Sequence, residues 1–175
     1  VTGGDLVWGE PGTIVTGVSI DTRTLTKGAA FFALKGERAD GHDFLEAAIK
    51  AGSSAVIAEK DYGLAGIQEQ NPATAMIKVK NTEKALRDLA AYYLSQFRVK
   101  KIGVTGSTGK TTTKEMLYSM LSEKYVTIRN QGNYNNLIGL PLSVFQVDHT
   151  TEAVVFEMGM DRPGEIHRLA RIVRP

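Results

Sequence analysis

The residues best suited to chemistry lie in one glycine-rich segment. Residues 103–113 read Gly-Val-Thr-Gly-Ser-Thr-Gly-Lys-Thr-Thr-Thr, between an apolar run that predicts a strand and a predicted helix. Gly106 and Gly109 let the backbone approach a polyphosphate and turn its N–H groups inward, and the helix start adds a partial positive charge. Lys110 can neutralise the β and γ phosphates, and the Thr111 hydroxyl can bind Mg²⁺. The segment therefore predicts a phosphate loop for ATP or a related nucleotide.

The segment departs from the common phosphate-loop pattern at one position. That pattern has a glycine six residues before the lysine, where this chain has Val104. An ordinary glycine-rich strand-to-helix turn is the alternative, but it does not explain the three threonines after Lys110. We expect the following residues to contact the nucleotide: Thr105, Gly106, Ser107, Thr108, Gly109, Lys110, Thr111 and Thr112.

Two further groups of polar residues suit the same site. Glu157 follows the apolar run 153–156, so it is predicted at the C-terminal end of a strand, where parallel sheets bind ligands. An acid at this place helps to hold Mg²⁺ in phosphate-loop proteins, and the alternative is an acid facing solvent. The amide-rich stretch 130–136 offers uncharged donors and acceptors beside a phosphate. Its density of Asn and Gly alone also fits a turn-rich surface loop.

A third group of charged residues lies near the N-terminus. Asp21-Thr22-Arg23 ends one predicted strand, and the segment 35–42, which contains Gly41 and His42, follows the next. The two loops can meet at one end of a small sheet, where Arg23 and a helix start would take an anion. A solvated charged rim with an aspartate helix cap is the simpler alternative.

Composition excludes several classes of function. The net charge is +2 with acids and bases interleaved, so we expect neither nucleic acid nor a membrane surface as a partner. The chain has no cysteine, which removes disulfides and thiolate chemistry and fits a reducing compartment such as the cytoplasm. No segment has the apolar length of a membrane span. The ends at Val1 and Pro175 are interpreted as cuts within a longer protein.

The pattern of the whole chain predicts an α/β fold in two parts. Predicted strands alternate with helices, which implies a mainly parallel sheet. Residues 1–97 are predicted to form a small α/β domain, and residues 98–175 to begin a mainly parallel-sheet phosphate-loop domain. The helix after the phosphate loop is expected to bury Met116, Leu117, Met120 and Leu121, and the segment 62–72 is expected to be a loop.

Taken together, these motifs resemble the Mur ligase family, the ATP-dependent amide ligases that build the peptide stem of peptidoglycan. The resemblance rests on the phosphate loop, on the sequence Gly-Asn-Tyr-Asn-Asn-Leu-Ile-Gly-Leu-Pro that starts at Gly132, and on Glu-Met-Gly-Met from Glu157. It also accounts for Val104, because this family lacks the first glycine. The motifs are most similar to the branch that adds D-alanyl-D-alanine to UDP-N-acetylmuramoyl-tripeptide.

The resemblance implies roles for individual residues. Lys110 would be catalytic and would bind ATP, while Thr111 and Glu157 would hold Mg²⁺. Asn135 and Asn136 would lie where phosphate and substrate meet. The UDP part of the substrate would contact an N-terminal UDP-binding domain, at the residues Asp21, Thr22, Arg23, Gly41 and His42.

The implied reaction converts a carboxylate into an acyl phosphate, which the amine of D-alanyl-D-alanine then attacks. Alternatives within the family are a lysine- or diaminopimelate-adding ligase, or a folylpolyglutamate-type ligase. A non-catalytic nucleotide-binding module is an alternative of another class. The resemblance covers only the first part of a family member, so we expect a cytoplasmic, monomeric enzyme of which this chain alone is inactive.

Overall fold

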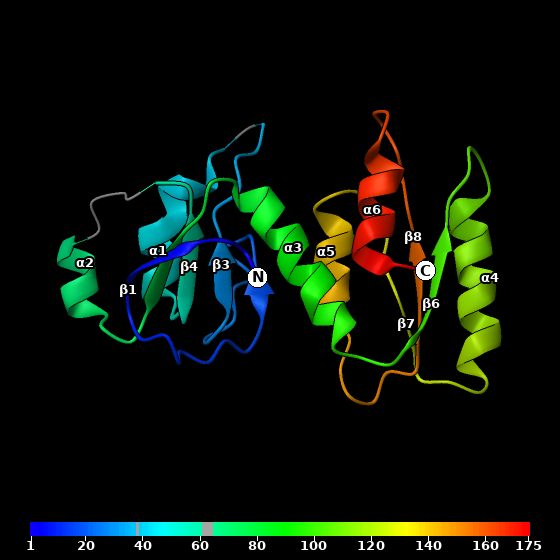
Figure 1. Cartoon of the computed structure of the whole chain (residues 1–175), viewed down its shortest axis with the longest axis horizontal. Helices are drawn as coiled ribbons and strands as arrows, with labels where there is room; N and C mark the ends of the chain where they lie inside the picture. Colours follow the sequence, from blue (N-terminus) through cyan, green and yellow to red (C-terminus); the bar gives the residue numbers. More distant parts are fainter. Residues whose placement is uncertain (38, 61–64) are drawn as a thin grey trace. The chain divides into compact units, whose positions relative to one another are not determined.

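The computed structural model describes residues 1–37, 39–60 and 65–175 (Figure 1). The contacts divide the chain into two compact units, Val1–Leu86 and Arg87–Pro175. The division falls inside helix α3, Thr82–Ser95, and so precedes the predicted boundary between residues 97 and 98. Ala90 and Leu94, in the C-terminal half of α3, pack into the apolar core of the second unit. By packing, this half of the helix belongs to the second unit.

The first unit contains a five-stranded sheet in the order β1-β5-β4-β3-β2. The four strands β2 to β5 are parallel, as predicted, whereas β1 is antiparallel to β5. Asp21 was predicted to end a strand, but the strand that joins the sheet here consists only of Val18 and Ser19, so that prediction was largely wrong. The strands are β1 Asp5–Trp8, β2 Val18–Ser19, β3 Ala30–Phe32, β4 Ala55–Ala58 and β5 Ala75–Lys78.

Short helices connect the strands of the first unit. The 3₁₀ turn η1, Gly41–Phe44, leads into α1, Leu45–Lys50, which buries Leu45, Ala48 and Ile49 against the sheet core. Gly52 ends this helix with a φ of 90°, a conformation that favours glycine. Helix α2, Ala65–Gln70, occupies most of the segment 62–72, which was predicted to be a loop. That prediction was therefore wrong for the residues of α2. Residues 61–64 of that region, and residue 38, lie outside the described residues.

The second unit is a parallel three-stranded sheet in the order β6-β8-β7, with helices on both faces (Figure 1). Val154 and Phe156 of β8, Ala153–Glu157, pack toward α5, Gly139–Val144, α6, Glu165–Val173, and the end of α3 in one apolar core. Helix α4 covers the other face. The other elements are β6 Lys100–Val104, α4 Lys110–Ser122 and β7 Thr127–Arg129.

Helix α4 turns only part of the predicted face to the sheet, because Leu117 and Leu121 are half-buried whereas the two methionines are exposed. Met116 and Met120 are 61% and 69% exposed, whereas the Lys114 residue is 1% exposed. The half-buried Leu117, Tyr118 and Leu121 follow Lys114 at helical spacing, and the two methionines lie on the opposite side. The apolar periodicity failed here because the lysine has polar partners at the ends of two strands.

Candidate active site at the phosphate loop

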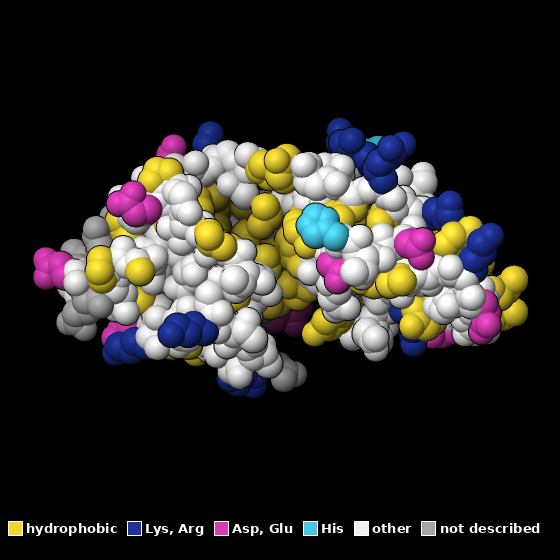
Figure 2. All heavy atoms as spheres, turned by 90° about the horizontal axis from the view of Figure 1, so that it is seen from below, with side chains coloured by type: hydrophobic (Ala, Val, Ile, Leu, Met, Phe, Trp, Pro, Cys, Tyr) yellow, Lys and Arg dark blue, Asp and Glu magenta, His cyan; other side chains and the backbone are white. Residues whose placement is uncertain are grey.

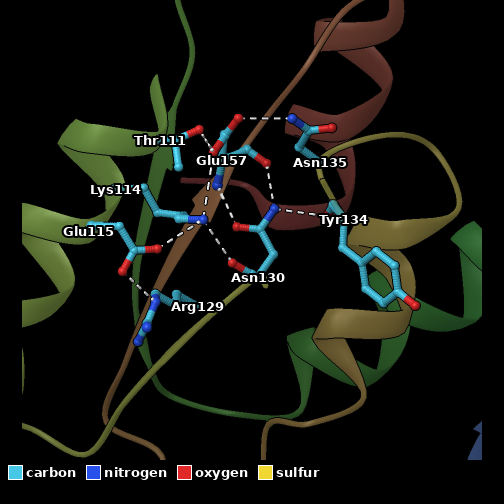
Figure 3. A network of polar contacts seen from close by, with 8 residues as sticks. All are labelled: Thr111, Lys114, Glu115, Arg129, Asn130, Tyr134, Asn135 and Glu157. Atoms are coloured by element: carbon cyan, nitrogen blue, oxygen red, sulfur yellow. Dashed lines mark hydrogen bonds and ion pairs between the residues drawn. The ribbon is translucent and has the colours of Figure 1, made fainter. Parts of the chain in front are cut away.

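The parallel register of β6 and β8 places the phosphate loop beside Glu157. Val104, the last residue of β6, lies opposite Glu157, the last residue of β8. The loop leaves β6 at this point and leads into α4, whose second residue is Thr111. The Thr111 hydroxyl donates a hydrogen bond of 2.8 Å to Glu157 Oε2 (Figure 3). The structure therefore brings together the two residues predicted to hold Mg²⁺.

The phosphate loop itself is open to solvent and has the backbone that glycine permits. Residues 105–109 are all exposed. Gly106 and Gly109 have φ values of 152° and 75°, in the region that side-chain-bearing residues rarely adopt. Lys110 Nζ donates to the carbonyl oxygen of Gly106 at 2.8 Å, so its ammonium lies over the loop. A phosphate seated in the loop would meet this cation and the start of α4.

The two asparagines predicted at this junction have different surroundings. Asn135 Nδ2 donates to Glu157 Oε1 at 2.8 Å, so its side chain lies at the carboxylate. Asn136 Oδ1 instead accepts from the backbone N–H groups of Ile138 and Gly139, at 3.1 and 2.8 Å, and so supports the start of α5. The structure thus brings Asn135, and not the Asn136 side chain, to Glu157.

Gly159 makes room for Asn135. Its N–H donates to the Asn135 carbonyl oxygen at 2.8 Å, and a Cβ at Gly159 would lie 2.9 Å from the Asn135 side chain. Such a separation is shorter than a non-bonded contact allows. A side chain at position 159 would therefore displace the amide that holds Glu157.

Asn130 joins the ends of β7 and β8, a role that the sequence did not reveal. It is fully buried. Its Nδ2 donates to the carbonyl oxygens of Tyr134 and Glu157 at 2.8 and 2.9 Å, and its Oδ1 accepts from the Glu157 N–H at 2.8 Å. The side chain thus satisfies the backbone polar groups where the two strands separate, which buried groups require. The only signal in the sequence was its place directly after the predicted strand.

The sequence also failed to reveal three charged side chains next to Glu157. Lys114 pairs with Glu157 and Glu115, and Glu115 pairs with Arg129, whose guanidinium lies 3.7 Å from the centre of the Tyr118 ring. Burial raises the pKa of Glu115, but the hydrogen bond from Lys114 and the charge of Arg129 outweigh it and lower that pKa. We call the following set the polar network (Figure 3): Thr111, Lys114, Glu115, Arg129, Asn130, Asn135 and Glu157.

The residues predicted to bind an anion in the first unit contact one another. Arg23 Nε donates to the two carboxylate oxygens of Asp21 at 2.9 and 3.1 Å. The hydrogen bonds from Arg23 lower the pKa of Asp21 to about 2. The Arg23 side chain is 86% exposed, so it can turn toward a ligand, and Thr22 lies half-buried between the two.

Gly41 and His42 are parts of the packing of the first unit. His42 is buried, with Nδ1 at 2.5 Å from Asp40 and Nε2 accepting from the Glu59 N–H at 3.1 Å. This pattern assigns the ring proton to Nδ1. A Cβ at Gly41 would lie 2.6 Å from the Leu34 nitrogen, so glycine is required there. Both residues therefore shape the loop, and their contact with a substrate stays a prediction.

Comparison with known protein families covers most of both units. The model of the Mur ligase family, catalytic domain, matches residues 14–94, and the model of the Mur ligase middle domain matches residues 104–175. The chain belongs to the Mur ligase family. The second match begins at Val104, the position at which this chain departs from the common phosphate-loop pattern.

Curated relatives and solved structures of Mur ligases agree with this assignment. UDP-N-acetylmuramoyl-tripeptide–D-alanyl-D-alanine ligases of Bacillus subtilis and Treponema pallidum are 44% and 41% identical over 93% and 91% of the chain. MurF from Acinetobacter baumannii superposes with a TM-score of 0.84 at 37% identity over 94% of the chain. MurF from Thermotoga maritima, solved in complex with ADP, superposes with a TM-score of 0.79 at 35% identity over 93% of the chain.

This Mur ligase chain spans about a third of the length of those proteins. It covers 35% and 36% of the two curated relatives, and the same shares of the two structures. Within residues 1–37, 39–60 and 65–175, no helix is both long and apolar enough to cross a membrane. The same residues contain no group of three or more His, Cys, Asp or Glu side chains placed to hold a metal ion.

Proposed function

We propose that the chain provides the ATP site and the UDP-substrate domain of a ligase that adds D-alanyl-D-alanine to UDP-N-acetylmuramoyl-tripeptide. The main structural support for this proposal is the contact between Thr111 and Glu157 beside the exposed phosphate loop. The named relatives support the choice of reaction, and the ADP complex of a structural neighbour supports the nucleotide.

The donor atoms beside the loop fit Mg²⁺. The oxygens of Thr111 and Glu157 are 2.8 Å apart. Two neighbouring ligands of an octahedral Mg²⁺, each at about 2.1 Å, are separated by about 3.0 Å, close to this distance. Both are hard oxygen donors, as this ion prefers. Bound there, the ion would neutralise charge on the phosphates of ATP during transfer.

Each residue of the site has a task that its position allows. The loop N–H groups and the start of α4 would hold the phosphates of ATP, with Lys110 over the loop to balance the charge of the transferred phosphoryl group. Asn135 fixes the Glu157 carboxylate through its amide. The transferred group converts the substrate carboxylate into an acyl phosphate, whose phosphate leaves when the amine attacks. Positioning and charge neutralisation are the main contributions of the protein.

The first unit is proposed to bind the UDP part of the substrate. Arg23 supports this assignment, because its exposed guanidinium can exchange Asp21 for a diphosphate. Thr22, Gly41 and His42 belong to the same proposal as neighbours in the two loops. We further propose that the enzyme works as a monomer and that it lies in the cytoplasm. A reducing compartment fits the lack of cysteine in this chain.

Calorimetric titration of the chain with ADP, with and without Mg²⁺, tests the nucleotide site. We expect Mg²⁺ to increase the affinity of the wild type and to have little effect on Glu157→Gln, because the amide is a weaker ligand than the carboxylate. Equal effects of Mg²⁺ on both proteins would assign Glu157 a structural role. On the complete enzyme, a panel of D-alanyl-D-alanine, lysine, diaminopimelate and glutamate acceptors separates the proposed reaction from the other ligases.

A further inference from the structure

Lys114 is a buried cation with three oxygen atoms near its ammonium group. Its side chain is 1% exposed. Nζ lies 3.0 Å from the Asn130 carbonyl oxygen, 3.2 Å from Glu115 Oε1 and 3.6 Å from Glu157 Oε2 (Figure 3). An ammonium group has three N–H donors, and three acceptors surround this one. A buried charge with so complete a set of partners is held in one place.

The charges around Lys114 cancel. The polar network contains two carboxylates, Glu115 and Glu157, and two cations, Lys114 and Arg129. The Glu157 side chain is only 4% exposed, so the nearby ammonium acts on it with little screening by water. The formal charge of the polar network is therefore zero, although its Glu157 carboxylate is the predicted ligand of a divalent cation.

The described residues of this chain offer few ligands to that cation. Thr111 and Glu157 supply oxygens, and the described parts of the chain place no cluster of three or more acidic, His or Cys side chains for a metal. Mg²⁺ gives up its water reluctantly and is commonly held by one or two carboxylates together with substrate phosphates. A neutral network with one buried carboxylate therefore binds Mg²⁺ weakly when no polyphosphate is bound.

We propose that Lys114 is a positioning residue that makes divalent-cation binding depend on nucleotide, because its ammonium balances Glu157 until a polyphosphate supplies the missing negative charge. This inference rests on the proposed ATP site and adds an order of binding to it. Lys110 and Lys114, one helical turn apart, then have separate tasks. Lys110, at the start of α4, lies over the exposed loop where the phosphates would bind, and Lys114 would set the charge of the cation site from the interior.

Binding of Mn²⁺ to the chain, followed by electron paramagnetic resonance with and without ADP, tests the proposal. For the wild type we expect weak Mn²⁺ binding alone and tight binding with ADP. Lys114→Met retains much of the side-chain volume and leaves the network with a net negative charge, so nucleotide-free Mn²⁺ affinity should rise roughly tenfold or more. Lys114→Arg keeps the charge and should behave as the wild type, while the exposed Lys124→Met is the matched control.

A second variant changes the charge in the opposite direction. Glu115 is 44% exposed, so Glu115→Gln should fold, and it leaves the network with a net positive charge. We expect Mn²⁺ affinity in the presence of ADP to fall roughly threefold. If circular dichroism shows that Lys114→Met is unfolded, the Mn²⁺ affinity of Glu115→Gln tests the role of Lys114 instead.

The outcomes distinguish a failure of the proposed nucleotide site from a failure of the proposed role of Lys114. A wild type that binds no Mn²⁺ even with ADP would overturn the proposed nucleotide site and this inference with it. A wild type that behaves as expected, beside a Lys114→Met protein with unchanged or weaker nucleotide-free binding, would overturn the role of Lys114 alone. An unchanged Glu115→Gln protein would do the same.

Discussion

The two groups of predicted site residues differ in how the fold uses them. At the phosphate loop, Thr111, Asn135 and Glu157 come from three distant parts of the sequence and meet at one carboxylate. In the first unit, Asp21 accepts from Arg23 two residues away. His42 contacts Asp40, also two residues away, and it accepts a bond from the backbone N–H of the more distant Glu59. Long-range convergence of polar groups indicates a site built for a ligand, whereas bonds between near neighbours also satisfy the needs of a loop.

The largest expected effect concerns Lys110, at the phosphate loop. Replacing Lys110 with Ala in the complete ligase should lower the ligation rate by on the order of a thousandfold, because the cation over the loop is lost. Phosphate release measures the rate, with Lys124→Ala as the exposed control. A Lys110→Ala enzyme that retains its rate would show that the loop does not bind the reacting phosphates.

Asn130 should be needed for stability of the second unit. Asn130→Ala leaves buried backbone groups of Tyr134 and Glu157 without partners, which should cost about 3 kcal/mol. Hydrogen exchange of the β8 amides measures the loss, with the β4 amides as an internal reference. The control Asn136→Ala removes only bonds at the start of α5 and should cost about 1 kcal/mol. Equal losses for the two variants would contradict a special role for Asn130.

His42 distinguishes a packing role from a binding role in the first unit. His42→Leu leaves the Glu59 N–H without its acceptor and should cost about 2 kcal/mol. Urea unfolding followed by fluorescence of Trp8, which packs in the core of this unit, measures the change. Arg23→Gln should leave stability nearly unchanged and weaken binding of UDP. If His42→Leu instead weakens UDP binding at unchanged stability, the histidine is a substrate contact.

The smallest effect concerns Asp21. Its pKa of about 2 in the folded chain lies below the ordinary 3.8, so the ion pair stabilises the fold above about pH 4 and this contribution is lost as the pH falls toward 2. The side-chain carboxyl of Asp21, titrated by nuclear magnetic resonance, should shift toward 3.8 in Arg23→Gln. An unshifted value in the variant would mean that Arg23 is not its partner in solution.

The sequence predicted those parts of the structure that local patterns encode. The phosphate loop and the strand before Glu157 have characteristic residues at fixed spacing, and each was found where expected. The sequence did not reveal β1, because its pairing with β5 joins segments about seventy residues apart. It also failed for α4, where apolar periodicity favoured Met116 and Met120 and the partners of Lys114 decided otherwise.

The same limit applied to the site. Glu157 was predictable from its place after an apolar run, but Asn130 and Lys114 depend on contacts across the fold. Asn130 lies among several similar residues, and a lysine on a helix is ordinarily exposed. Their roles follow only from three-dimensional neighbours, which no spacing in this sequence encodes.

The alternation along β8 has a consequence for how this protein can change during evolution. Phe156 packs in the apolar core, and the next residue, Glu157, faces α4 and the phosphate loop. Losing or gaining one residue within β8 would exchange the two faces, with an aromatic ring beside the phosphate loop and a carboxylate among aliphatic side chains. Substitutions can therefore accumulate around this strand, while its length is expected to tolerate no insertion or deletion between Ala153 and Glu157.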